Sequence, residues 1–195
     1  MARAEIVNPS PTWVAEFREI AGALRAALGR LALRIDHIGS TSVPGLAAKD
    51  VIDVQVTVAT LDLDALAPGF ERAGFLPAPD NPRRDHRPPD ATGPDDDWTK
   101  LYFRPAPGVF GARRINLHVR AAGSANQRYA LLFRDYLRTH PPAAQAYAEL
   151  KRRLAGLGLD TAVYADVKDP ACDLIMQAAE PWACHANWRP GPSDA

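Results

Sequence analysis

The segment GSTSVPGL, from Gly39 to Leu46, limits the fold more than any other stretch of this sequence. It holds two glycines, three hydroxyl residues and a proline between two segments that both have the pattern of buried strands. A connection inside a compact domain commonly takes about two to six ordinary turn residues. A longer connection of this composition, followed closely by Lys49 and Asp53, indicates a loop that binds a ligand and does more than reverse the chain.

The segment after this loop, residues 51–58, is the clearest strand in the sequence. It is rich in β-branched residues, which suit a pleated, half-buried surface. Because side chains alternate along a strand, one face is aliphatic and the other carries Asp53, Gln55 and Thr57. We expect the polar face to point to where the loop emerges. Residues 31–38, before the loop, show a similar alternation and are predicted to form a second strand.

The rest of the pattern predicts one α+β domain over residues 1–195. Residues 1–125 should form the sheet-containing core, residues 126–183 a helical C-terminal portion and residues 184–195 a tail. Further strands are expected at 99–104 and 113–120, and helices at 10–28, at 61–74, on both sides of Pro141-Pro142, and at 170–182. The last helix is expected to turn Leu174, Ile175, Ala178 and Ala179 inward.

Residues 77–98 form the longest predicted loop. The segment contains six prolines, a basic cluster at 83–87 and the acidic run Asp95 to Asp97. A loop of this length inside a compact domain is usually a functional lid or a disordered segment, and both interpretations stay open.

Charge and composition argue against several classes of function. The chain has 23 basic and 23 acidic residues, so no overall field attracts nucleic acid or an anionic membrane. Cys172 and Cys184 cannot supply a disulfide framework or a four-ligand zinc site. No apolar run has the length of a signal peptide core or a membrane span. We therefore expect a cytoplasmic protein without a nucleic-acid partner, and we assign no oligomeric state.

The loop and the strand after it have the residues of a phosphate site. Backbone N–H groups of a Gly- and Ser-rich turn can converge on an anion, and hydroxyl groups add donors. Asp53 could hold Mg²⁺ beside the phosphate, because magnesium is usually bound by one or two carboxylates together with substrate phosphates. The alternative is an ordinary turn followed by a solvated aspartate.

Several segments together resemble one family. The run from Ile38 to Lys49 (IGSTSVPGLAAK) with Ile52-Asp53 looks like the signature of the GrpB family, a group similar to the nucleotidyltransferase superfamily. The resemblance continues in Asn116–Val119, Gly123-Ser124, Phe133–Arg138, Tyr147 and Leu150-Lys151. It implies a nucleotidyltransferase-like fold, a mixed β-sheet flanked by helices. Active members of that superfamily carry a Gly-Ser pair and three acidic residues on two strands, which hold two magnesium ions.

This chain departs from that pattern at two of the three acidic positions. Asp53 matches the first carboxylate, but Gln55 stands at the second, where its neutral oxygen is a weak ligand for Mg²⁺. The third position falls on residues 113–120, where Asn116 and His118 are the candidates. The resemblance thus implies a better preserved phosphate site than metal site.

Three hypotheses follow. The first is a GrpB family protein that binds a nucleotide or other phosphorylated small molecule, with degenerate catalysis; its ligand-binding residues are Gly39, Ser40, Thr41, Ser42, Gly45, Lys49 and Arg114. The second is an active metal-dependent nucleotidyltransferase with Asp53 and His118 as catalytic residues and Mg²⁺ on Asp53 and Gln55. The third is a non-catalytic interaction domain. GrpB-like domains occur joined to dephospho-coenzyme A kinases, which adds coenzyme A precursors to the ligands worth testing.

Two further sets of polar residues allow more than one role. His37 and His118 are either a pair that supplies a proton or a ligand to one cleft, or histidines that orient the loop. On the predicted helices, charged residues are expected to be solvated or salt-bridged, and these are Arg134, Arg138 and Lys151. Lys168 is the exception, because it resembles a family position near the cleft.

Overall fold

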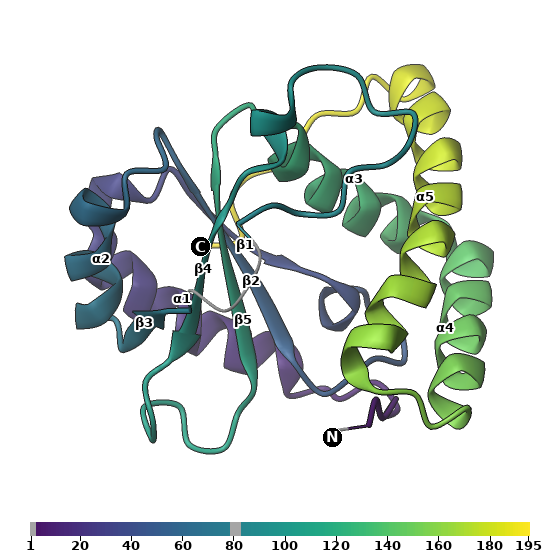
Figure 1. Ribbon diagram of the computed structural model, residues 1–195, viewed down its shortest axis with the longest axis horizontal. Coiled ribbons are helices and arrows are strands. Elements are labelled where there is room, and N and C mark those ends of the chain that lie inside the picture. Colours follow the sequence, from purple (N-terminus) through teal and green to yellow (C-terminus); the bar gives the residue numbers. More distant parts are fainter. Residues whose placement is uncertain (1–2, 79–82) are drawn as a thin grey trace.

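The computed structural model describes residues 3–78 and 83–195, and its centre is a five-stranded mixed sheet (Figure 1). The strands are β1 (Arg34–Ile38), β2 (Ile52–Val58), β3 (Phe75–Pro77), β4 (Leu101–Pro105) and β5 (Ile115–Ala121). Their order is β1-β2-β5-β4-β3, in which β2 and β5 are parallel and every other neighbouring pair is antiparallel. The predicted α+β class with a mixed sheet is confirmed.

Helices lie on both sides of the sheet. Figure 1 shows α1 (Trp13–Leu28) and α2 (Leu63–Arg72) on one side, and α3 (Ala125–Thr139), α4 (Pro141–Gly156) and α5 (Thr161–His185) on the other. The last three helices follow the final strand, as the periodicity predicts. In residues 3–78 and 83–195, no helix has the length and apolar character needed to cross a membrane.

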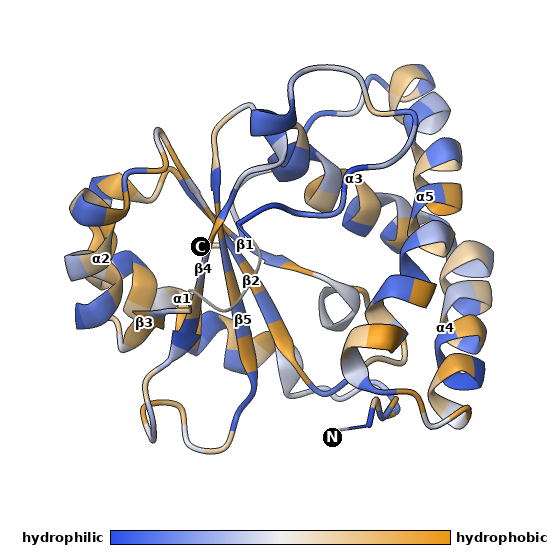
Figure 2. Ribbon diagram, viewed as in Figure 1, coloured by the Kyte–Doolittle hydropathy of each residue, from blue (hydrophilic) through white to orange (hydrophobic). Residues whose placement is uncertain are grey.

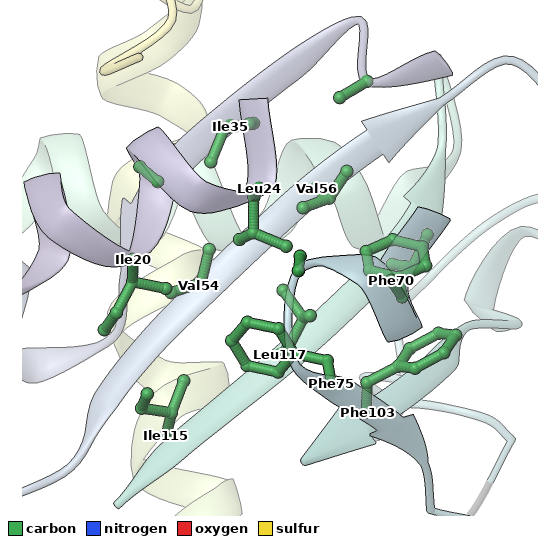
Figure 3. Close-up of a cluster of buried hydrophobic side chains, with 14 of the residues drawn as sticks. Ile20, Leu24, Ile35, Val54, Val56, Phe70, Phe75, Phe103, Ile115 and Leu117 are labelled. Atoms are coloured by element: carbon green, nitrogen blue, oxygen red, sulfur yellow. The ribbon is translucent and has the colours of Figure 1, made fainter. Parts of the chain in front are cut away.

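The main core lies between the sheet and the first two helices. The aliphatic face of β2, with Val54 and Val56 fully buried, packs against Ile20 and Leu24 of α1 (Figure 3). Phe70, Phe75 and Phe103 continue this core toward the other edge of the sheet. Burial of each such side chain stabilises the fold by about 1.5–3 kcal/mol. Figure 2 shows the resulting alternation of apolar and polar residues along β2 and β5. Polar residues of these strands line a cavity together with residues of α3 to α5.

The first strand is shorter than predicted. Residues 29–31 form a 3₁₀ turn after α1, and pairing with β2 begins only at Arg34, opposite Thr57. Leu31 and Leu33, whose alternation suggested a strand, are 46% and 51% exposed. β3 was not predicted, because a strand of three residues is too short for its alternation to be recognised.

The last helix begins nine residues earlier than predicted. Asp160 caps it by accepting a hydrogen bond from the backbone N–H of Ala162, and Pro170 lies inside the helix. The predicted inward face is confirmed for Ala179, which is fully buried, and for Ile175, which packs against a buried cluster. It is wrong for Leu174, which is 67% exposed, and for Ala178, which is also exposed. The face that is buried consists of Cys172, Met176, Ala179 and Ala183.

The C-terminal residues lie along the outer edge of β1. The Ser193 hydroxyl donates to the carbonyl of Ile35 at 2.9 Å and accepts from its N–H at 2.8 Å. The Asp194 carboxylate accepts a hydrogen bond from the N–H of His37 at 2.9 Å. Residues 193–195 therefore occupy positions where another strand would otherwise pair.

Candidate functional site: a cationic cavity between the sheet and the C-terminal helices

A cavity of about 440 Å³ lies between the polar face of β2 and β5 and helices α3 to α5. This volume is in the range of small-molecule sites. The sheet contributes Asp53, Asn116, His118 and Arg120, and the loop after β1 contributes Gly39, Ser40 and Thr41. The helices contribute Tyr129, Phe133, Tyr147, Lys151, Tyr164, Lys168 and Cys172.

The loop after β1 passes very close to Asp53. Gly39 has φ +68°, which glycine adopts at little cost. A Cβ at this position would lie 2.3 Å from Oδ2 of Asp53. Residues 40–42 then form a 3₁₀ turn whose own hydrogen bonds use the N–H groups of Ser42 and Val43. Glycine at 39 is therefore required both by the backbone conformation and by the neighbouring carboxylate.

His37 supports this loop from behind. Its Nε2 lies 3.0 Å from the Thr41 hydroxyl, and that hydroxyl donates to the carbonyl of Val51 at 3.1 Å. Because the single hydroxyl hydrogen is used there, Nε2 of His37 must carry the proton and donate to Thr41. Burial, together with Arg138 and Arg134, lowers the pKa of His37 to about 3, so the ring is neutral. His37 does not line the cavity, so the structure supports its loop-orienting role.

Three basic side chains of the C-terminal helices reach the same loop. Lys151 donates to the Ser40 hydroxyl at 2.8 Å and to the carbonyl of Ala47 at 2.5 Å. Arg138 donates twice to the carbonyl of Ser42, at 3.1 and 2.9 Å, and Arg134 donates to the carbonyl of His37 at 3.1 Å. The expectation that these residues are solvated or salt-bridged is confirmed for Arg134, which is 3% exposed and forms ion pairs with Asp135 and Asp194 at 2.8 Å. It is wrong for Lys151, which is also 3% exposed and binds the loop.

Lysine ammonium groups give the cavity a positive region. Burial and the nearby Lys168 lower the pKa of Lys151 to about 7. The ammonium of Lys49 lies 5.1 Å from the centre of the Tyr164 ring, and no carboxylate of the described residues is within ion-pair distance of it. Lys168 contacts Asp169 at 3.4 Å and the Cys172 sulfur at 3.2 Å. Although burial favours its neutral form, Cys172 and Asp169 raise the pKa of Lys168, so Lys168 carries a charge. With Lys49, which has no carboxylate partner among the described residues, it gives the region a positive charge that can attract an anion.

Asp53 is held beside this positive region. Its Oδ1 accepts a hydrogen bond of 2.7 Å from the side-chain amide of Asn116, the residue opposite it on β5. Burial raises the pKa of Asp53, and the hydrogen bond from Asn116 and the charge of Lys49 oppose that effect. The position agrees with the sequence prediction that Asp53 lies beside the loop.

Gln55 has a role that the sequence did not indicate. It is fully buried, its Oε1 accepts a hydrogen bond of 2.5 Å from Arg120, and its amide donates to the carbonyl of Gln127 at 3.3 Å. Arg120 also donates to Asp85 at 2.8 Å, and Lys100 contacts the other oxygen of Asp85 at 2.8 Å. Although burial opposes ionisation, these two cations hold the pKa of Asp85 below its usual value.

The donor atoms do not fit a two-magnesium centre. Of the three positions that the resemblance indicates, Asp53 alone is a carboxylate, and the oxygen of Gln55 is already bound to Arg120. The side-chain oxygen of Asn116 accepts a hydrogen bond from Tyr102. Within the described part of the chain, no group of three or more His, Cys, Asp or Glu could hold a metal ion.

The structure brings together most of the predicted site residues. Gly39, Ser40, Thr41, Lys49, Asp53 and His118 line the cavity. Burial and Arg120 lower the pKa of His118, which is therefore neutral. The Ser42 hydroxyl is used within the loop, where it donates to the carbonyl of Gly39 at 2.6 Å, and Gly45 is exposed at a turn with φ +75°. Arg114 is exposed and lines a separate surface hollow with Asp50.

Lys151 is the main site residue that the sequence analysis missed. It follows Tyr147 by four residues and precedes Leu154 by three, so it shares their buried face of α4. That spacing and the family resemblance of Leu150-Lys151 were the available signals, and both were outweighed by the usual exposure of lysine.

The described part of the predicted long loop closes one side of the cavity. Asp85, His86 and Trp98 line it, and Nε2 of His86 lies 3.0 Å from the Asp173 carboxylate of α5. Residues 79–82 of the same prediction lie outside the described residues. The indole N–H of Trp98 is buried and has no hydrogen-bond partner in the described part of the chain.

Comparisons with known proteins agree on the family. The GrpB protein family matches residues 3–178 of this chain. The chain is 36% identical to a dephospho-CoA kinase of Mycobacterium tuberculosis over 208 residues, which cover 97% of this chain but 49% of the kinase. The chain thus spans about half the length of the mycobacterial relatives that it matches. It is 33% identical to a UPF0157 protein of Halalkalibacterium halodurans, with 91% of this chain and 83% of that protein covered.

A solved structure supports the same assignment. The crystal structure of the conserved protein GrpB from Enterococcus faecalis aligns with a TM-score of 0.71 and 31% identity, covering 91% of this chain and 99% of that one. The family match, these relatives and the shared fold lead to one conclusion: the chain belongs to the GrpB family.

Proposed function

We propose that the cavity binds a nucleotide or another phosphorylated small molecule. The observation that carries this proposal is the group of three lysines, Lys49, Lys151 and Lys168, around the hydroxyl-bearing loop at Ser40. Burying ammonium groups close together costs free energy, and the lowered pKa values of Lys49 and Lys151 reflect that cost. A bound phosphate would offset it by accepting charge-assisted hydrogen bonds.

A row of aromatic rings along one wall supports a ligand with a planar apolar part. The ammonium of Lys151 lies 4.6 Å from the centre of the Tyr147 ring. From there the ring centres of Tyr147 and Phe133, Phe133 and Tyr129, and Tyr129 and Trp98 are 5.6, 6.3 and 5.7 Å apart. The row ends at Trp98, which also lines the cavity. A nucleotide combines these two chemical characters.

Calorimetric titration tests the proposal directly. The probes are ATP, inorganic pyrophosphate and dephospho-coenzyme A, the last because mycobacterial relatives are named dephospho-CoA kinases. Lys49→Gln should weaken binding about tenfold or more, since a hydrogen bond to a charged group contributes about 1.5–3 kcal/mol. Arg18→Gln is the matched control, because Arg18 is exposed on α1, across the sheet from the cavity. Absence of binding at millimolar concentrations of all three probes would refute the proposal.

Cysteine labelling gives an independent measurement. Cys172 lines the cavity and is buried, whereas Cys184 is exposed. A ligand in the cavity should slow alkylation of Cys172 by N-ethylmaleimide and leave that of Cys184 unchanged. Equal protection of both thiols would point to binding elsewhere.

A further inference from the structure

We propose that the cavity binds its phosphate ligand as a metal-free anion, with Arg120 and the cavity lysines supplying the positive charge that Mg²⁺ would otherwise supply. This inference rests on the proposed function and specifies the charged state of the ligand that the site selects. It rests on the observation that oxygen atoms on the polar face, which could coordinate a metal ion, are already bound to donor groups of the protein.

The guanidinium of Arg120 already binds the side-chain oxygen atoms that would have to coordinate a metal ion. It donates to the Oε1 of Gln55 at 2.5 Å and to Oδ2 of Asp85 at 2.8 Å. Both oxygens are therefore bound to a permanent cation, because arginine remains protonated in proteins. A magnesium ion at Gln55 would have to displace a buried hydrogen bond from that guanidinium and would lie next to its charge.

Of the two other carboxylates that line the cavity, Asp169 is paired with Lys168 at 3.4 Å, and Asp53 faces cations of the protein. Its ionisation is favoured by the charges of Lys49, Lys168 and Arg120, and one of its oxygens is bound to the amide of Asn116. Magnesium prefers octahedral coordination by oxygen and is usually held by carboxylates together with phosphates. One partly used carboxylate surrounded by fixed positive charge is a poor ligand set for it.

The same arrangement is well suited to a ligand that carries its full negative charge. Lys49 has no carboxylate within ion-pair distance in the described part of the chain, so its charge is available to the ligand. Mg²⁺ on the ligand would cancel part of the charge that these ammonium groups attract and would add repulsion inside the cavity. We therefore expect Mg²⁺ to weaken binding, the reverse of its usual effect at nucleotidyl-transfer sites.

The test compares the affinity of the protein for ATP in excess EDTA and in excess MgCl₂ by calorimetry. Free ATP should bind at least about tenfold more tightly than MgATP, a difference of about 1.4 kcal/mol. Pyrophosphate, which lacks a base, should show the same preference. Tighter binding in MgCl₂ would overturn the inference while leaving the proposed function standing. Absence of binding to any probe in both buffers would overturn both.

Two variants show whether the preference arises in this cavity. Arg120→Gln should reduce the preference for free ATP, and circular dichroism will show whether this buried position tolerates the change. Lys168→Gln provides the same test at a less demanding position on α5, and it too should reduce the preference. Arg18→Gln should preserve it. An unchanged preference in folded Lys168→Gln and Arg120→Gln would contradict the assignment of the charge to these groups.

Discussion

Replacing Gly39 by alanine tests the link between the loop and Asp53. The new Cβ would lie 2.3 Å from Oδ2 and 2.9 Å from Cγ of Asp53, so the carboxylate has to move. Gly39 has φ +68° and ψ −173°, a backbone region essentially restricted to glycine, in which alanine costs about 1–3 kcal/mol. Displacing Asp53 from the amide of Asn116 adds about 1.5–3 kcal/mol for the loss of a hydrogen bond to a charged group. We expect the free energy of unfolding to fall by about 2.5–6 kcal/mol, the sum of these two costs.

Gly45→Ala is the matched control for this change. Gly45 belongs to the same loop and has φ +75°, but an added Cβ there would meet nothing within 4 Å. It should therefore show the backbone cost alone, about 1–2 kcal/mol. Urea unfolding followed by circular dichroism measures both variants, and in an Asp53→Ala background the cost of Gly39→Ala should fall to its backbone cost, about 1–3 kcal/mol. Equal destabilisation of the two single variants in the wild-type background would refute the reasoning.

Three further predictions use titrating groups and the segment that closes the cavity. The pKa of Asp53 is raised in the folded state, so ionising Asp53 lowers the stability of the fold at pH values above the unfolded-state pKa. Asp53→Asn, which cannot ionise, should therefore match or exceed the wild-type melting temperature at pH 7. This gain should vanish in acid, where Asp53 is protonated. Lys151 has a folded-state pKa of about 7, so above pH 7 the unfolded chain binds more protons than the folded one. The stability of the wild type should therefore rise relative to that of Lys151→Met as the pH increases from 7 toward 10.5. Parallel plots of stability against pH for the two proteins would contradict this. His86→Ala removes the contact with Asp173 and should increase hydrogen exchange in residues 83–98. The free energy of unfolding should change by no more than about 0.5 kcal/mol. Unchanged exchange would show that the contact does not hold this segment.

The strand and loop at the site were predictable because their signal is local. Alternation in residues 51–58 gave the polar face with Asp53, and the composition of the loop marked where a ligand would lie. These features depend on periodicity of two residues, which the sequence shows directly. Asn116 was a candidate on the polar face of residues 113–120, but its contact with Asp53 was not predicted, because the register between β2 and β5 is set by residues about 63 apart.

The contributions of the C-terminal helices were harder to predict. Lys151 lies 111 residues from Ser40 in the sequence, and a one-dimensional pattern does not show which helix face meets which loop. The role of Gln55 was missed for a similar reason: its partner Arg120 lies 65 residues away on a parallel strand, and no local pattern links the two. Pro170 gave an error of another kind, because a proline commonly begins a helix but here lies within one.

The C-terminal residues along β1 have two roles: they cover the edge of the sheet, and they contact residues that support the loop after β1. By covering the edge of β1, Ser193 and Asp194 remove a surface on which another chain could add a strand. Asp194 also accepts hydrogen bonds from His37 and from Arg134, which both support the loop. Protection of the edge of β1 and support of the loop at Ser40 therefore depend on the same few contacts, so a substitution at Asp194 would disturb both.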